Sequence, residues 1–212
     1  MKVNIIIDVL RAFTVSHIAF IKGVERIYLV ANKSLAFGMK EKNPEYILCG
    51  EEHGLLIHGF DLDNSPTNII SKELSGEILV QKTTNGTKVT LDNLDADRIF
   101  VTGYSNSKTL VKYLHTININ YLNIIPSRQK DDDLAVKDYI ERLYKHKSLS
   151  TIDIIQRITD SDIAMKFFND KRFNPKDIVY STTNFDTNFI MEIKSDERNN
   201  VYIQKITMKD YY

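Results

Sequence analysis

Strand-like runs alternate with helical patterns along most of the chain, and this alternation constrains the fold more than any other feature. The first run is rich in β-branched residues and ends at Asp8, after which apolar residues take helical spacing up to Gly23. Strands are expected at residues 3–7, 26–30, 46–49, 78–80, 98–101 and 120–125, and helices at 14–22, 34–40, 87–94, 107–115 and 131–143. This order predicts an α/β protein whose mostly parallel or mixed sheet is covered by helices on both faces.

The pattern changes after Lys147. Residues 151–157 and 161–168 are expected to be helical, and residues 201–207 are expected to form an edge strand. No linker, repeat or low-complexity tract separates the parts. The sequence therefore predicts one compact unit over residues 1–212, with its motifs in residues 1–147 and a divergent part in residues 148–212.

Charge and cysteine content narrow the class of protein. Among 212 residues, 28 are Lys or Arg and 28 are Asp or Glu, so no global field attracts nucleic acid or an anionic membrane. The single cysteine, Cys49, excludes an internal disulfide and reads as a buried small hydrophobe. With neither a signal peptide nor a transmembrane span in the sequence, we expect a cytoplasmic protein that binds neither nucleic acid nor membrane.

Residues 78–87 combine a buried strand with a polar glycine turn. The strand leads into Thr83-Thr84-Asn85-Gly86-Thr87, and Thr87 can cap the helix that follows. A strand, a polar turn and a helix start can present backbone N–H groups and hydroxyls to an anion. The same pattern also fits an ordinary turn in which Asn85-Gly86 only supplies positive φ.

Polar residues follow the other strands as well. They are Asp8 and Arg11, Glu51, residues 61–65, Asn106, Arg128 and residues 131–133. Carboxylates, arginines and hydroxyls at the carboxyl ends of strands are typical of a divalent-metal phosphate site. We therefore expect one pocket lined by Asp8, residues 61–65, residues 84–87 and Asn106. Helix capping, Asx-turns and the helix macrodipole are structural alternatives for individual members of the set.

Four motifs in order resemble the 2-phosphosulfolactate phosphatase (ComB-like) family. They are Ile7-Asp8-Val9-Leu10-Arg11-Ala12, Gly59-Phe60-Asp61-Leu62-Asp63-Asn64-Ser65-Pro66, Thr83-Thr84-Asn85-Gly86-Thr87 and an acidic helix start near Asp132. The likeness runs to about Leu143 and is faint beyond Lys147. It implies a three-layer α/β/α fold and Mg²⁺-dependent hydrolysis of a phosphate monoester. The family's named substrate is 2-phospho-3-sulfolactate, an intermediate on the route to coenzyme M.

The mechanism we expect from this resemblance is metal-assisted hydrolysis. Asp8, Glu51 and Asp132 are the candidate Mg²⁺ ligands, and Asp8 and Asp61 are the candidate catalytic residues, with Asp61 as ligand or base. The expected substrate-binding residues are Arg11, Asn64, Ser65, Thr84, Asn85, Gly86, Thr87, Asn106 and Arg128. Asp8 is a covalent nucleophile in one alternative, but such enzymes carry a second Asp two residues on. Leu10 occupies that position here, which favours a water nucleophile.

Two loops depart from the family pattern. Gly50-Glu51-Glu52-His53-Gly54 stands where Gly-Glu-Arg-Gly-Gly is common, and Ile125-Pro126-Ser127-Arg128 replaces a Cys-Ala-Gly stretch. A lost arginine would alter recognition of a doubly anionic substrate. A catalytically impaired homologue that binds small anions is therefore the alternative function. The partner expected is a small phosphate ester, and the oligomeric state stays open, with a homodimer as one option.

Histidines in the loop after residue 50 are a weak indication of metal binding or proton transfer. His53 and His58 lie five residues apart outside any helical pattern, and a structural role is the expectation for His58.

Overall fold

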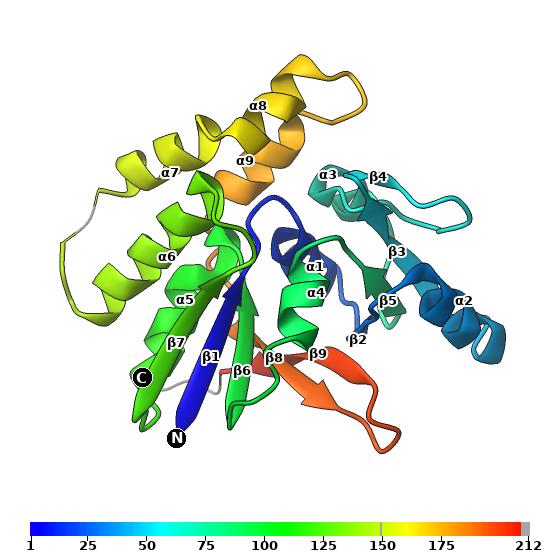
Figure 1. Ribbon diagram of the computed structural model, residues 1–212, viewed down its shortest axis with the longest axis horizontal. Helices are drawn as coiled ribbons and strands as arrows, with labels where there is room; N and C mark the ends of the chain where they lie inside the picture. The colour runs from blue at the N-terminus through cyan, green and yellow to red at the C-terminus, as the bar shows by residue number, and fades with distance from the viewer. Residues whose placement is uncertain (149, 209–212) are drawn as a thin grey trace.

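The computed structural model describes residues 1–148 and 150–208, which form helices packed around one mixed β-sheet (Figure 1). Within these residues the strand order is β4-β3-β5-β2-β9-β8-β6-β1-β7. The strands are β1 (Lys2–Ile7), β2 (Arg26–Leu29), β3 (Ile47–Glu52), β4 (Leu55–Leu56), β5 (Ile78–Lys82), β6 (Arg98–Thr102), β7 (Tyr121–Pro126), β8 (Phe189–Ser195) and β9 (Val201–Thr207). The helices are α1 (Ala12–Ile21), α2 (Lys33–Lys42), α3 (Pro66–Ile70), α4 (Gly86–Leu91), α5 (Tyr104–Leu114), α6 (Asp131–Tyr144), α7 (Thr151–Thr159), α8 (Asp162–Asn169) and α9 (Lys176–Thr182).

Every strand and helix expected from the sequence is present, with boundaries shifted by a few residues. The sequence patterns missed β4, α3, α9 and β8. The first three are short, and β8 follows the polar loop of residues 183–188.

Strand β1 shows why the fold has three layers. Its side chains alternate in direction, so Val3, Ile5 and Ile7 pack in one hydrophobic core with α5 and α6. Ile6 packs in a second core with α1, on the opposite face of the sheet. The sheet is thus buried between helices, and the expected three-layer α/β/α architecture is confirmed.

Two groups of parallel strands make up most of the sheet, and a hairpin separates them. β1 pairs in parallel with β6 and β7, while β5 pairs in parallel with β2 and β3. The antiparallel hairpin β8–β9 lies between β2 and β6, and Figure 1 shows it (orange to red) running across the bottom of the view.

The expectation of an edge strand at residues 201–207 is therefore wrong. β9 pairs with β2 along one edge and with β8 along the other. Its alternation of apolar and polar residues, with Ile203 fully buried, arises because one face is partly open to solvent. An open face and an open edge produce similar sequence patterns, and the sequence alone does not separate them.

The hairpin also changes how the strand ends meet. Three antiparallel pairings follow one another from β2 through β9 and β8 to β6, so the two parallel groups run in opposite senses along the sheet. Strand twist accumulates over these steps and turns one group relative to the other. The carboxyl ends of β1, β3, β5 and β7 nevertheless border the same cavity, although they do not share one parallel edge.

The region after residue 147 is part of the main body of the protein. Helices α7, α8 and α9 contribute Ile158, Phe167 and Ile178 to the hydrophobic core that also contains α6 and β1. Figure 1 shows these helices (yellow to orange) above α6 and α1. None of the helices in the described residues is long and apolar enough to cross a membrane.

Candidate active site

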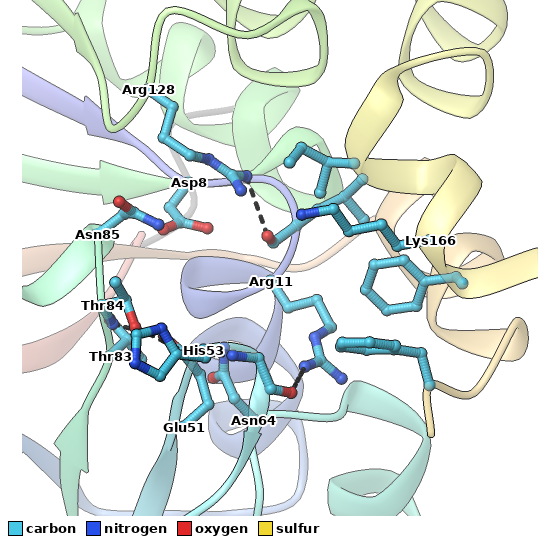
Figure 2. Close-up of a pocket in the computed structure, with 15 residues that line it drawn as sticks. Asp8, Arg11, Glu51, His53, Asn64, Thr83, Thr84, Asn85, Arg128 and Lys166 are labelled. Carbon is cyan, nitrogen blue, oxygen red and sulfur yellow. Dashed lines mark hydrogen bonds between the residues drawn. The ribbon is translucent and has the colours of Figure 1, made fainter. Parts of the chain in front are cut away.

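One cavity of about 270 Å³ lies where the carboxyl ends of both strand groups approach α8 (Figure 2). It is lined by Asp8, Leu10, Arg11, Glu51, His53, Gly54, Asn64, Thr83, Thr84, Asn85, Arg128, Ile163, Lys166, Phe167 and Phe173. Most of the polar groups come from strand ends and their turns. The helix side of the cavity is mainly apolar.

Asp8 sits at the end of β1, where the backbone holds its carboxylate in place. Oδ1 accepts a hydrogen bond from the backbone N–H of Ala12 at 3.0 Å, and Oδ2 accepts one from Ser127 Oγ at 3.2 Å. Burial raises the pKa of Asp8, and the positive charge of Arg128 opposes that rise. A Cβ on Gly86 would lie 2.8 Å from Oδ2, so only glycine lets the turn after β5 come this close to the carboxylate.

The turn after β5 is stabilised by threonine hydroxyls. Thr83 Oγ1 accepts a hydrogen bond from the backbone N–H of Thr87 at 3.0 Å and lies 2.9 Å from its hydroxyl. The sequence predicts Thr87 as the N-cap of this helix, and this prediction is wrong. Helix α4 already begins at Gly86, so Thr87 lies inside it. Thr84 and Asn85 face the cavity instead (Figure 2).

Glu51 connects this turn to the hairpin formed by β3 and β4. Its carboxylate accepts hydrogen bonds from the backbone N–H and the hydroxyl of Thr84, and from the N–H of Gly54 at 2.6 Å. His53 lines the cavity from the same hairpin turn, where it adopts a left-handed backbone conformation with φ of 56°. The side chain of Glu51 is buried and lines the cavity. Its hydrogen bonds also hold in place two loops of the cavity wall, the turn after β5 and the turn between β3 and β4.

Arg128 lies opposite this turn, at the end of β7. Its Nη2 donates to the carbonyl oxygen of Leu10 at 3.0 Å and to Asp132 Oδ2 at 2.9 Å. Burial acts to lower the pKa of Arg128, but the charges of Asp8 and Asp132 outweigh it and raise the pKa. The guanidinium is thus held charged and in one orientation at the cavity wall.

Asp133 supports this wall from below and was not among the expected site residues. It accepts hydrogen bonds from the backbone N–H of Val9 at 2.9 Å and of Arg128 at 3.0 Å, and from Ser127 Oγ at 2.8 Å. Burial and then the charge of Asp8 raise its pKa well above the usual range. Its place in the acidic helix start is visible in the sequence, but its contacts with the end of β1 are not.

Arg11 is expected to clamp substrate, yet its guanidinium is already engaged by the protein. Nη1 forms a buried ion pair with Asp177 of α9 at 2.8 Å, and Nη2 donates to the carbonyl oxygen of Gly54 at 2.8 Å. The group also lies over the rings of Phe167 and Phe173, at 5.0 and 5.6 Å from their centroids. Arg11 therefore lines the cavity and joins α9 to the hairpin turn.

The structure brings only part of the expected set together. Asp8, Arg11, Glu51, Asn64, Thr84, Asn85 and Arg128 line the cavity, whereas Asp61, Ser65, Gly86, Thr87, Asn106 and Asp132 do not. Asp61 is the clearest correction, because its carboxylate binds Lys40 Nζ at 2.6 Å and the N–H of Leu48 at 2.8 Å on the protein surface. Asp61 directly precedes Leu62, which forms a parallel bridge with Cys49 of β3, and its side chain points toward Lys40, away from the cavity.

Ser65 and Asn106 have structural partners. Ser65 Oγ donates to Asp177 at 2.7 Å, and the side chain of Asn106 accepts hydrogen bonds from Thr102 Oγ1 and the N–H of Gly103 at the start of α5. Both residues are buried, and neither lines the cavity. Cys49 is buried as expected, and burial raises the pKa of its thiol.

Sequence patterns missed the α8 side of the cavity. Ile163, Lys166 and Phe167 come from α8, and Phe173 comes from the loop that follows. The helix was expected from its apolar periodicity, but no motif in it indicates that it lies over strand ends that are distant in the chain.

The possible metal ligands are few. No group of three or more His, Cys, Asp or Glu side chains in residues 1–148 and 150–208 is arranged to hold a metal ion. Asp8 and Glu51 both line the cavity, and Asp132 is buried beside Arg128 with its Oδ1 lacking a partner among the described residues.

Comparisons with known proteins identify the family of this chain. The family model described as 2-phosphosulpholactate phosphatase matches residues 1–186, well beyond Lys147. A protein of Bacillus subtilis (strain 168) named "Probable 2-phosphosulfolactate phosphatase" is 42% identical over 200 residues, covering 92% of this chain and 88% of the relative. A similarly named protein of Carboxydothermus hydrogenoformans is 31% identical over 178 residues, covering 84% of this chain and 72% of the relative. The "2-phosphosulfolactate phosphatase" of Methanocaldococcus jannaschii is 33% identical over 146 residues, covering 66% and 60% of the two chains. From the extent of these matches, the chain belongs to the 2-phosphosulpholactate phosphatase family.

Proposed function

We propose that this protein is a Mg²⁺-dependent phosphatase that hydrolyses a small acidic phosphate monoester of the 2-phosphosulfolactate type. The observation that carries the proposal is that one cavity, in a member of this family, joins Asp8 and Glu51 to Arg128 and the turn at Thr84. Carboxylates that can hold a cation, together with an arginine and hydrogen-bond donors for the phosphoryl group, are what a metal-assisted phosphate site requires.

Binding of the phosphoryl group is assigned to Arg128 and the turn after β5. Nη2 of Arg128 is used by protein acceptors, while Nη1 has no acceptor in the described part of the chain and can donate to a phosphoryl oxygen. Asn85 also lines the cavity, and Figure 2 shows its side chain beside the carboxylate of Asp8. The amide of Asn64 is 3% exposed and its Oδ1 has no partner among the described residues, so a substrate hydroxyl or a water can donate to it.

The residues present fit Mg²⁺ in its usual protein environment. This ion is commonly held by one or two carboxylates, with waters and substrate phosphate oxygens completing the shell. Asp8 and Glu51 would be those carboxylates, while Asp132 would act through its ion pair with Arg128. When bound, Mg²⁺ supplies positive charge that stabilises the phosphoryl oxygens during the reaction.

The reaction assigned to the site is an in-line displacement by water. The water oxygen bonds to phosphorus, the bond from phosphorus to the ester oxygen breaks, and inorganic phosphate and the free alcohol result. Asp8 would orient the attacking water, because its carboxylate is fixed at the end of β1. Leu10, two residues on, has no acidic side chain to protonate a leaving group, and this supports water over Asp8 as nucleophile.

Phosphate release from a panel of esters tests the proposal. The panel contains 2-phosphosulfolactate, 2-phospholactate and ethyl phosphate, each with MgCl₂ and with EDTA. We expect turnover with Mg²⁺ that EDTA abolishes and added Mg²⁺ restores. Mg²⁺ in about hundredfold excess over its Kd should also raise the free energy of unfolding by about 2.7 kcal/mol. Absence of turnover on every ester would overturn the proposed activity. A melting temperature that Mg²⁺ leaves unchanged would overturn the proposed binding of Mg²⁺.

A further inference from the structure

The helix side of the cavity carries one cation whose charge is not matched by the protein. Lys166 of α8 lines the cavity, and Figure 2 shows its amine extending into the cavity from the α8 side. Among the described residues, Nζ of Lys166 forms neither an ion pair nor a hydrogen bond. An ammonium in this position can pair with an anionic group that enters the cavity.

The other two cations that line the cavity differ in this respect. Arg11 is neutralised by Asp177 in a buried ion pair. Arg128 is paired with Asp132 and faces Asp8, so its positive charge is balanced by neighbouring carboxylates. Among the described residues that line the cavity, Lys166 is thus the cation that can still pair with an anionic group of a ligand.

The surroundings of Lys166 also differ from those of Arg128. Ile163 and Phe167 flank it on α8 and leave the rest of this side apolar. The hydrogen-bond donors for a phosphoryl group come from the strand ends, at Arg128 and the turn after β5. A small ester that spans the cavity would therefore place its phosphoryl group at the strand ends and its remaining acid against α8.

We infer that Lys166 binds the second acidic group of the substrate, a carboxylate or a sulfonate, and so determines specificity for phosphate esters that carry such a group. The inference rests on the phosphatase activity proposed above and adds the residue that would select the substrate. It assigns Lys166 to binding and not to phosphoryl transfer, because the amine comes from α8, whereas the phosphoryl donors come from the strand ends.

Kinetics of Lys166→Met on the three esters of the panel provide the test. The methionine keeps the length and apolar stem of the side chain but removes the charge. We expect kcat/KM to fall about 10- to 100-fold on esters with a second acid, mainly through KM, as for a lost hydrogen bond to a charged group. Activity on ethyl phosphate should stay at the wild-type level. If kcat/KM falls on 2-phosphosulfolactate alone, the group that Lys166 binds is the sulfonate. If it falls on 2-phospholactate as well, the group is the carboxylate.

Two further variants act as controls. Lys166→Arg keeps the charge and should restore most of the discrimination between the esters. Lys171→Met removes an exposed lysine that follows α8 and does not line the cavity, so it should behave as wild type on every ester. Equal losses on all three esters in Lys166→Met, or no loss on any, would overturn the inference.

A binding measurement separates this inference from the proposed activity. Sulfolactate keeps both the carboxylate and the sulfonate but has no phosphoryl group to be hydrolysed. Calorimetric titration of wild-type protein and Lys166→Met with sulfolactate should show a weaker Kd in the variant. If wild type turned over no ester, the proposed activity would fail, and equal affinity of the two proteins for sulfolactate would refute the role of Lys166.

Discussion

At the scale of single residues, Asp8 carries the largest expected effect on catalysis. Its carboxylate is fixed by Ala12 and Ser127, and asparagine keeps the shape while removing the charge. We expect Asp8→Asn to lower kcat by at least about 10²-fold, or about 2.7 kcal/mol of barrier. Asp61→Asn is the matched control, since Asp61 also belongs to a family motif but binds Lys40 on the surface. Near-normal turnover in Asp8→Asn with an intact fold would refute the mechanism.

His17 gives the protein a second residue-scale property, a dependence of stability on pH. Its ring lies in the core between Ser105 Oγ at 3.0 Å and Thr187 Oγ1 at 3.1 Å, and burial lowers its pKa from 6.5 to about 3. The unfolded chain therefore binds a proton that the folded protein does not. Stability is complete above pH 6.5 and is lost as pH falls toward the folded pKa.

Urea unfolding at two pH values tests this property. From about pH 7.5 to about pH 5, His17 should account for a loss of roughly 2 kcal/mol in the free energy of unfolding. His17→Gln keeps a hydrogen-bonding side chain without a titrating ring, so its pH dependence should be smaller by this amount. A variant as pH-sensitive as wild type would show that His17 is not the cause.

At the scale of helices and strands, Asp177 holds three elements together around the site. From α9 it pairs with Arg11 at the start of α1, and it accepts hydrogen bonds from Ser65 Oγ and the N–H of Thr67 at the start of α3. Asp177→Ala leaves a buried guanidinium without its partner, and we expect the free energy of unfolding to fall by about 3–5 kcal/mol.

Chemical denaturation measures this loss, with Asp170→Ala as the control. Asp170 also pairs with an arginine, Arg172, but the side chain of Arg172 is 66% exposed. Asp170→Ala should therefore lower the free energy of unfolding by at most about 1 kcal/mol. Similar losses in the two variants would contradict a special role for the buried pair.

At the scale of the whole molecule, the C-terminal hairpin joins the two halves of the sheet. β8 and β9 supply the pairings between β2 and β6, and Met191 and Ile203 lie in the core beside α1. A chain of residues 1–147 keeps the family motifs but exposes the facing edges of β2 and β6. We therefore expect it to lack a cooperative unfolding transition in calorimetry, and a sharp transition would show that residues 1–147 fold alone.

Local patterns of the sequence determined the elements and most of the polar groups that line the cavity. Alternation and helical periodicity predicted the strands and helices of residues 3–143 except the short β4 and α3, because these signals depend on neighbours in the chain. The turn at Thr84 and the ends of β1 and β7 could be identified as site candidates for the same reason. These residues are close to the ends of their own strands, so their position follows from local structure.

Only the tertiary structure decided which candidates meet and what covers them. The sense of each strand group depends on β8–β9, which lies far away in the chain, and the side chain of Asp61 faces outward from its position near β3. Lys166 reaches the cavity because α8 packs against α6 and α9, a contact between amphipathic faces that many pairings would satisfy equally well in sequence. The chemistry of the strand ends could thus be predicted, whereas the charge that faces them depended on long-range packing.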